Sequence, residues 1–245
     1  MYDDVGLIRD NAALAQPGTL PEALGHDLFH FASSRASPYW RPVVTASYYL
    51  EQALGGGSAA VFHGGNLVAL WASALALFAL VRDRTGLLPA ALVASLLVVH
   101  PLTVEPAVNI ASRTDLLCLL FAALALRSEG GVAALALALL ACGSKELAVG
   151  LPVVAWLLDP RHPRWRWMAL ASVLFLGGRA MVLWGHAAPE DPPTLEFVSG
   201  AGWRMAWMGA RLLLPGSLPP AMTVAPPGPG LALAGWGVVA LTGLA

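Results

Sequence analysis

Charged residues are scarce in this chain. Asp, Glu, Lys and Arg together make up 12% of its 245 residues, whereas a water-soluble domain carries roughly a quarter. The hydrophobic share is 57%, and the mean hydropathy is +0.66. The apolar residues occur in long runs separated by short charged or Pro/Gly-containing breaks. This pattern predicts an all-α, polytopic helical membrane protein rather than a soluble domain.

Cysteine and excess positive charge are also nearly absent. Cys118 and Cys142 both lie inside apolar runs, so we interpret them as small buried hydrophobic residues, not as a disulfide or a metal-binding pair. The formal net charge of −1 provides no basic surface, so we expect no nucleic-acid partner. The first residues are acidic, which predicts no cleavable signal peptide. Abundant Ala, Gly, Pro and Arg with few Lys are typical of a GC-rich bacterial genome.

The apolar runs predict the membrane-spanning helices. Residues 1–60 are polar and hold no spanning segment, so we expect an outer loop with short helices there. Residues 61–245 are expected to form a transmembrane bundle of about six to seven spans, the last cut short at the C-terminus. The predicted apolar segments are 61–81, 87–99, 116–126, 132–142, 147–158, 167–184 and 231–245, with 203–214 as an interfacial or re-entrant helix.

The two segments 116–126 and 132–142 could form two short spans or one long broken span. A single span would place Arg127, Glu129 and a Gly-Gly pair near the bilayer centre, where charges are costly. Two spans are therefore favoured.

The distribution of arginine predicts how the bundle is oriented. With two spans, one side of the membrane receives Arg82, Arg84, Arg127, Arg161, Arg164 and Arg166. Positive residues mark the cytoplasmic side. The opposite side receives residues 1–60, the 100–115 loop, Ser144 to Glu146 and the 185–200 loop. The acidic groups of the sequence are therefore expected to share the outer face.

The stretch HPLTVEPAVNIASRTDLL, residues 100–117, contains His100, Glu105, Arg113 and Asp115 between two apolar segments. Ionisable residues at the ends of hydrophobic spans are costly there and mark candidate functional sites. Arg113 suits an anionic phosphate, because its forked donors match phosphate oxygens. A purely structural role is the alternative for Asp115, since a carboxylate near a helix N-terminus is favoured by the helix dipole.

Two further charged groups could join this site. Asp3 and Asp4 could hold a divalent cation or deprotonate a hydroxyl group, although on local sequence alone a solvated acidic start to a loop is the commoner explanation. Lys145 could bind a phosphate at the bilayer surface. The alternative for Lys145 and Glu146 is a local ion pair in a plain loop.

Two other motifs can be interpreted either as functional sites or as ordinary structural features. The string HDLFH, from His26 to His30, has the spacing of a zinc peptidase motif. Asp27 replaces the usual Glu and no third ligand is evident, so a zinc site is a weak alternative. The aromatic residues around Arg41 in SPYWRPVVTASYYLEQAL could stack on a sugar, or could anchor a helix among lipid headgroups, which is commoner.

Five strings, taken in order, resemble the GT-C superfamily of polyprenyl-phosphate-sugar-dependent glycosyltransferases. More narrowly, they resemble the O-mannosyltransferases that carry transmembrane and tetratricopeptide repeats, and their bacterial relatives. The strings are YDDVGLIRDN, SPYWRPVVTASYYLEQALGG, FHGGNLVAL, HPLTVEPAVNIASRTDLL and SKELAVGLP, which cover residues 2–153; ARLLLPGSL resembles the family more weakly. The resemblance implies a GT-C-like bundle with a long first outer loop, in the bacterial inner membrane with its active face in the periplasm. These enzymes usually begin with a spanning helix before that loop, so we expect this chain to be a fragment that lacks the first helix and the repeats.

The resemblance also implies roles for individual residues. Asp3 or Asp4 would be the catalytic base or a metal ligand, and Asp115 would be the second catalytic acid. Asp3 and Asp115 would be the candidates to hold a divalent cation such as Mg²⁺ or Mn²⁺. Arg113 and Lys145 would bind the lipid-linked phosphate. The other candidate substrate-binding residues are Glu105, His100 and Arg41.

The expected activity is transfer of a sugar, with mannose as the leading case, from a polyprenyl-phosphate donor to a hydroxyl of protein Ser or Thr, or of a glycan. Such a reaction needs a base for the acceptor and positive charge for the departing phosphate. The alternatives are a non-catalytic membrane protein, such as a transporter or scaffold, and an inactive glycosyltransferase fragment. A transporter is expected to place polar residues near the bilayer midplane. The charges here are predicted at the ends of spans, which favours the transferase.

Overall fold

The computed structural model describes residues 4–32 and 37–184. The chain divides into two compact units, Met1–Ala188 and Pro189–Ala245, and all described residues belong to the first. Asp3, the 185–200 loop and the predicted segments 203–214 and 231–245 lie outside the described residues.

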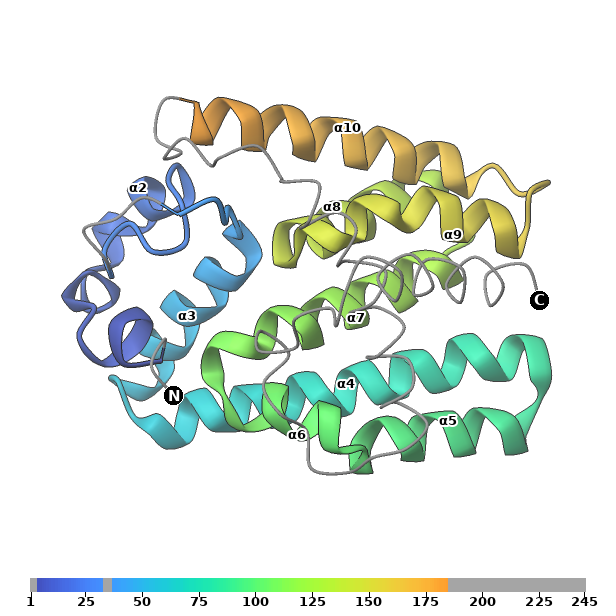
Figure 1. The fold of residues 1–245 in the computed structure, drawn as a ribbon, viewed down its shortest axis with the longest axis horizontal. Helices are drawn as coiled ribbons and strands as arrows, with labels where there is room; N and C mark the ends of the chain where they lie inside the picture. Colours follow the sequence, from blue (N-terminus) through green and yellow to red (C-terminus); the bar gives the residue numbers. More distant parts are fainter. Residues whose placement is uncertain (1–3, 33–36, 185–245) are drawn as a thin grey trace, which may run out of the picture. The chain divides into compact units, whose positions relative to one another are not determined.

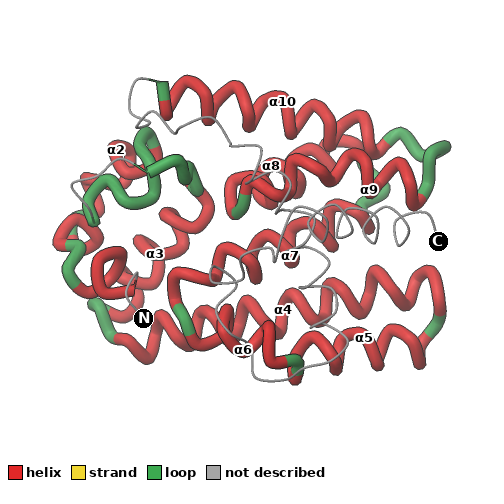
Figure 2. The backbone as a smooth tube through the Cα atoms, in the orientation of Figure 1, coloured by secondary structure: helices red, strands yellow, loops and turns green. Residues whose placement is uncertain are grey.

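The described part of the chain contains helices and no strands, which confirms the all-α prediction for it (Figures 1 and 2). The α-helices are α2 (Leu20–Leu24), α3 (Pro42–Gly55), α4 (Ala59–Thr85), α5 (Leu87–Val99), α6 (Pro101–Val108), α7 (Arg113–Arg127), α8 (Gly131–Ser144), α9 (Leu151–Leu158) and α10 (Arg164–Leu183). Shorter helical turns are η1 (Val5–Arg9), η2 (Ala12–Ala15), η3 (Pro17–Thr19), η4 (Ile110–Ser112) and η5 (Glu146–Gly150).

The helices end where the sequence predicts breaks. Gly86 separates α4 from α5 and has a φ of +91°, a conformation that side chains with a Cβ rarely adopt. Residues 128–130 separate α7 from α8, and these two helices pack against each other. The structure therefore has two helices over 113–144, as the charges and the Gly-Gly pair predicted.

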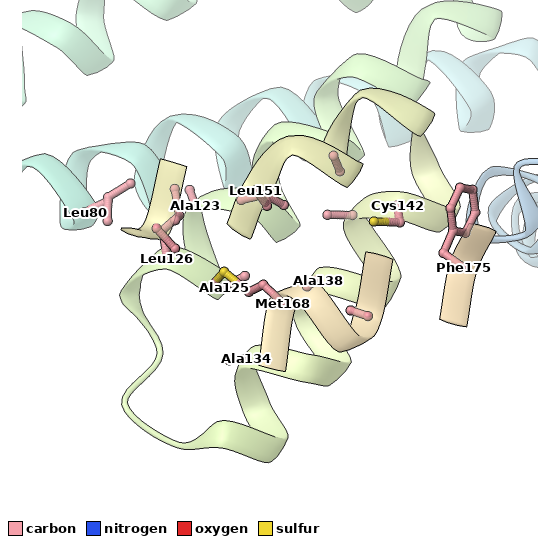
Figure 3. Packing of buried hydrophobic residues seen from close by; sticks show 14 of the residues in the cluster. Leu80, Ala123, Ala125, Leu126, Ala134, Ala138, Cys142, Leu151, Met168 and Phe175 are labelled. Carbon is pink, nitrogen blue, oxygen red and sulfur yellow. The ribbon is translucent and has the colours of Figure 1, made fainter. Parts of the chain in front are cut away.

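Small side chains allow α7, α8 and α10 to pack closely (Figure 3). The buried cluster between them contains Ala123, Ala125, Ala134, Ala138 and Ala171. A Cβ atom at Gly131 would lie 2.3 Å from Nε1 of Trp167, so only glycine leaves room for this indole. Close approach through small residues is typical of helix packing in membranes, where apolar side chains gain little by leaving the lipid.

Two of the described helices, α4 and α10, are long and apolar enough to cross a membrane, judged by length and composition. Helix α4 has 27 residues, which corresponds to a length of about 40 Å. Three shorter apolar helices, Leu87–Val99, Gly131–Ser144 and Glu146–Leu158, lie among the same residues. The membrane prediction is thus supported at two of the expected spans.

Candidate functional site

The start of the chain meets the loop that precedes α7. Oδ1 of Asp4 accepts a hydrogen bond from the backbone N–H of Ala111 at 2.7 Å, and Oδ2 accepts one from Ile110 at 3.2 Å. The structure therefore brings Asp4 close to the 100–117 stretch, although the two are far apart in the sequence. Both amides belong to η4, which leads directly into α7 and Asp115.

A cavity of about 240 Å³ lies beside this junction. It is called the cationic cavity here, and its polar lining residues are Tyr39, Arg41, Ser112, Thr114, Asp115 and Lys145. Lys145 forms an ion pair with Asp115, and Arg41 Nη2 lies 3.1 Å from Glu146 Oε2. The Arg41 guanidinium also lies over the ring of Tyr39, 4.6 Å from its centroid. Two cations from separate parts of the chain thus face one cavity.

Close packing of α3 on α8 explains how these charges meet. A Cβ atom at Gly143 would lie 2.9 Å from Cγ2 of Val43, so the end of α8 approaches the start of α3 through a glycine. Arg41 immediately precedes α3, and Lys145 follows α8 in an extended conformation. The sequence motif SKE is thereby placed next to the aromatic motif that contains Arg41.

A second cavity, of about 360 Å³, lies at the same helix end. It is called the acidic cavity, and its lining residues are Leu97, Thr103, Glu105, Pro106, Ser112, Asp115, Leu116 and Leu119. Among the residues that the structure describes, Glu105 and Asp115 are its ionisable lining residues, and none of its lining residues is a cation. Ser112 and Asp115 line both cavities and form what we call the shared wall.

Arg113 lies inside the fold, although it was expected to bind the lipid-linked phosphate. Its side chain is 2% exposed. Nε donates to Asn66 Oδ1 at 2.9 Å, Nη2 donates to the carbonyl of Phe62 at 2.9 Å, and Nη1 donates to Ser47 Oγ at 3.2 Å. Nη1 also lies 2.7 Å from Glu51 Oε2. Because these groups engage all three of its nitrogens and it lines neither cavity, the described cations that line the cationic cavity are Arg41 and Lys145.

The sequence pattern assigned Glu51 no role and assigned Glu146 only that of a local ion-pair partner of Lys145. Asn66 was expected either to pack between helices or to line the outer cavity. Asn66 is fully buried, and its Nδ2 donates to the carbonyls of Pro106 and Asn109. An available signal was the presence of polar residues inside otherwise apolar segments, in YYLEQAL and FHGGNLVAL. Nothing in either string indicates the partner, which lies far along the chain.

Burial changes the titration of the groups around Arg113. It raises the pKa of Glu51, and the neighbouring Arg113 partly offsets this rise. Burial also raises the pKa of Tyr48, whose hydroxyl donates to the carbonyl of Ile110 and whose ring lies 4.9 Å from the Arg113 guanidinium. Tyr48 is therefore a neutral hydrogen-bond donor to the loop before α7.

The raised pKa of Glu51 predicts a pH dependence of folding. A carboxyl whose pKa is higher in the folded state stabilises that state below its ordinary pKa of 4.5, and loses this contribution as pH rises through the raised value. We expect the wild type to lose stability relative to Glu51→Gln as pH rises from about 4 to 7. Thermal unfolding of both proteins in detergent measures the difference. Curves that stay parallel across this range would contradict the assignment.

His100 and the two histidines of the HDLFH motif line neither cavity, although Leu28 and Phe29 of that motif line the cationic cavity. His100 follows α5, its carbonyl accepts a hydrogen bond from Thr103 Oγ1 at 2.7 Å, and it lines neither cavity. The rings of His26 and His30 stack with centroids 4.0 Å apart, and His30 Nε2 lies 3.3 Å from Glu22 Oε1. The segment is not helical, so its spacing does not reproduce the helical zinc motif.

Two of the described carboxylates near the cavities, Asp115 and Asp4, are engaged by other groups. Asp115 is paired with the ammonium of Lys145, and Asp4 with two backbone amides. Across residues 4–32 and 37–184, no three His, Cys, Asp or Glu side chains gather in a way that could hold a metal ion. These residues do not by themselves fit a divalent-cation site, and a site that joins Asp3 to Asp115 stays a prediction.

Comparison of the chain with family models, with curated proteins and with solved structures returns no match.

Proposed function

We propose that the described unit is a polytopic bundle embedded in a membrane, oriented as the arginines predict. Large apolar side chains are exposed on its long helices, such as Trp71 at 58% and Val173 at 66%. Exposed apolar surface of this kind marks contact with lipid or a partner. At the end of α7 remote from the cavities, polar contacts join neighbouring helices. Arg127 Nε lies 2.6 Å from Asp83 Oδ2, and Arg164 donates to the carbonyl of Leu126. The arginine-rich end and the shared wall thus lie at opposite ends of α7.

Labelling from the two sides of the membrane tests this orientation. Ser112→Cys and Arg84→Cys are placed one at a time in a background with Cys118→Ala and Cys142→Ala, and are treated with a membrane-impermeant thiol reagent. In sealed inner-membrane vesicles of known orientation, the two positions should react from opposite sides, with Ser112→Cys on the periplasmic side. Reaction of both from one side would rule out the proposed bundle.

The function that the geometry supports best is transfer of a sugar from a polyprenyl-phosphate donor to a hydroxyl acceptor. The observation that carries this proposal is the position of Asp115, which lines both a cavity with two cations and a cavity whose described lining residues include none. Arg41 and Lys145 supply positive charge for a lipid phosphate at the bilayer surface. Asp115 supplies a carboxylate for an acceptor hydroxyl that enters from the acidic cavity.

The reaction then follows from these positions. The donor phosphate replaces Asp115 as the partner of Lys145, which frees the carboxylate to accept the proton of the acceptor hydroxyl. The hydroxyl oxygen forms a bond to the anomeric carbon of the sugar, and the bond from that carbon to the phosphate oxygen breaks. The departing lipid phosphate takes the electron pair, and Arg41 and Lys145 offset its developing charge. Mannose is the leading sugar, and protein Ser or Thr the leading acceptor.

A transfer assay in membranes tests the activity. Membranes that contain the chain are supplied with polyprenyl-phosphate mannose and with a peptide that contains Ser and Thr, and other lipid-linked sugars and glycan acceptors are tried in parallel. Transfer that depends on Asp115 supports the proposal. Absence of transfer from every donor, by protein shown to be folded, would favour a transporter, a scaffold or an inactive glycosyltransferase.

Lys145 is the only lysine in the chain, where thirteen other basic positions carry arginine. We expect Lys145→Ala to raise the KM for the lipid-linked donor by about tenfold or more, because a charge-assisted contact to phosphate is lost in the ground state. The effect on kcat should be smaller. Donor titrations measure both constants, and Arg127→Ala is the control, because Arg127 pairs with Asp83 at the opposite end of α7. An unchanged KM would assign Lys145 a structural role.

A further inference from the structure

We propose that Glu51, Asn66 and Arg113 form a positioning cluster that holds the shared wall in its working geometry. This inference rests on the proposed function, because it assigns these residues a role in the same site. None of the three lines either cavity. Their effect on the reaction would therefore be exerted through Ser112 and Asp115, and they are positioning residues rather than catalytic ones.

Arg113 connects three elements at one point. Its guanidinium contacts Ser47 and Glu51 of α3, and Asn66 and the carbonyl of Phe62 of α4, while its backbone begins α7. The planar fork of an arginine holds five donors in fixed directions, whereas the ammonium group of a lysine has three donors on a flexible stem. The first turn of α7 is thus tied to both neighbouring helices by a single side chain.

Glu51 has a dedicated space against α4. A Cβ atom at Gly65 would lie 1.8 Å from Glu51 Oε1, so the absence of a side chain at this position makes room for the carboxylate. The next residue, Asn66, accepts a hydrogen bond from Nε of Arg113 through its Oδ1. Gly65 therefore leaves space for the Glu51 carboxylate, and Asn66 provides an amide for Arg113.

The loop before the shared wall is held at several points. Nδ2 of Asn66 donates to the carbonyls of Pro106 and Asn109 at 3.0 and 2.9 Å. The carboxylate of Asp4 accepts from the two amides of η4 that follow. Ser112 and Asp115 flank Arg113 in the sequence, on either side of the point at which α7 begins. Movement of the Arg113 guanidinium would therefore move the wall between the two cavities.

Such a cluster is expected to contribute more to the geometry of the reacting groups than to the stability of the fold. A buried ion pair is weak evidence for net stabilisation, because desolvation offsets the attraction of the charges. Its geometry, however, fixes which groups lie together, and a displacement of a reacting group by about 1 Å can cost about 10²-fold in rate. The cluster is expected to act on turnover rather than on donor binding.

The test compares Arg113→Lys with Arg164→Lys. Arg164 is also buried, at 8% exposed, and it bonds the carbonyl of Leu126 at the opposite end of α7. We expect Arg113→Lys to lower kcat by about 10²-fold, with the KM for polyprenyl-phosphate mannose changed by no more than about threefold. Arg164→Lys should leave kcat unchanged per folded molecule. Glu51→Gln, which keeps the side-chain shape, should also lower kcat. It replaces Arg113→Lys as the test variant if Arg113→Lys does not fold.

A second measurement does not depend on transfer. Ser112→Cys, with Cys118→Ala and Cys142→Ala, is treated with a small anionic methanethiosulfonate reagent, and its modification rate is compared with and without Arg113→Lys. We expect Arg113→Lys to change this rate by at least about threefold, and Arg164→Lys to leave it unchanged. Unchanged modification in folded Arg113→Lys and Glu51→Gln proteins would overturn the positioning role. A changed rate in a protein without any transfer activity would uphold the cluster and refute the proposed function.

Discussion

Asp115→Asn is expected to lower sugar transfer by about 10²- to 10⁴-fold, which is the contribution of a positioned general base. Asparagine keeps the size of the side chain but cannot accept the acceptor proton at neutral pH. The ion pair with Lys145 is lost as well. Since Asp115 lies in the first turn of α7 and remains partly exposed, we expect the variant to fold. Initial rates at saturating donor and acceptor, normalised to folded protein, measure the loss.

Asp159→Asn is the matched control for this change. Asp159 also lies at a helix end and has an arginine partner, Arg164, whose Nη2 is 3.7 Å away, but it is at the end of the bundle remote from the cavities. Its substitution should leave transfer within about twofold of the wild type. If Asp115→Asn kept more than a tenth of the activity and Asp4→Asn lost it, the base would belong to the N-terminal acidic pair instead.

Asn66→Leu is expected to have the largest effect on stability. Leucine has a similar volume but cannot replace the amide, so Nε of Arg113 and the carbonyls of Pro106 and Asn109 would lose a buried partner. Each unsatisfied buried group costs about 1–3 kcal/mol, so a total of about 3 kcal/mol or more is expected. The free energy of unfolding in detergent, measured by denaturant titration, gives the value.

Ser73→Ala in the same helix provides the comparison. The Ser73 hydroxyl donates to the carbonyls of Ala69 and Leu116, each at 2.7 Å, and it is as fully buried as Asn66. Its removal should cost only about 1 kcal/mol, because one shared donor is lost and no charged group is left without a partner. If Asn66→Leu and Ser73→Ala lowered the free energy of unfolding equally, the Arg113 network would contribute no more to stability than an ordinary buried hydrogen bond.

The positions of the buried charges bear on the alternative of a transporter. Asn66 lies within the first third of α4, near the end that faces η4, and Glu51 and Arg113 lie beside it. A transporter is expected to carry its polar site near the bilayer midplane on interrupted helices. Helix α4 is continuous over Ala59–Thr85. This arrangement favours chemistry at the membrane surface, as the proposed transfer requires.

The sequence by itself determined the helical class and most helix boundaries. The structure has α4, α5, α8 and α10 within a few residues of the predicted apolar runs. These features are local: a helix begins and ends according to apolar runs, charges, Gly and Pro that are neighbours in the chain. The density of ionisable residues in 100–117 likewise pointed to the end of the bundle where the cavities lie.

Only the tertiary structure decided which of those ionisable residues face a cavity and which support it. Arg113 and Asp115 are two residues apart, yet one is enclosed by α3 and α4 and the other lines both cavities. The pairing of Arg41 with Glu146 depends on the close approach of α8 to α3 at Gly143. Such partners are set by the packing of helices distant in sequence, because the cost of burying a charge depends on the groups that surround it in space.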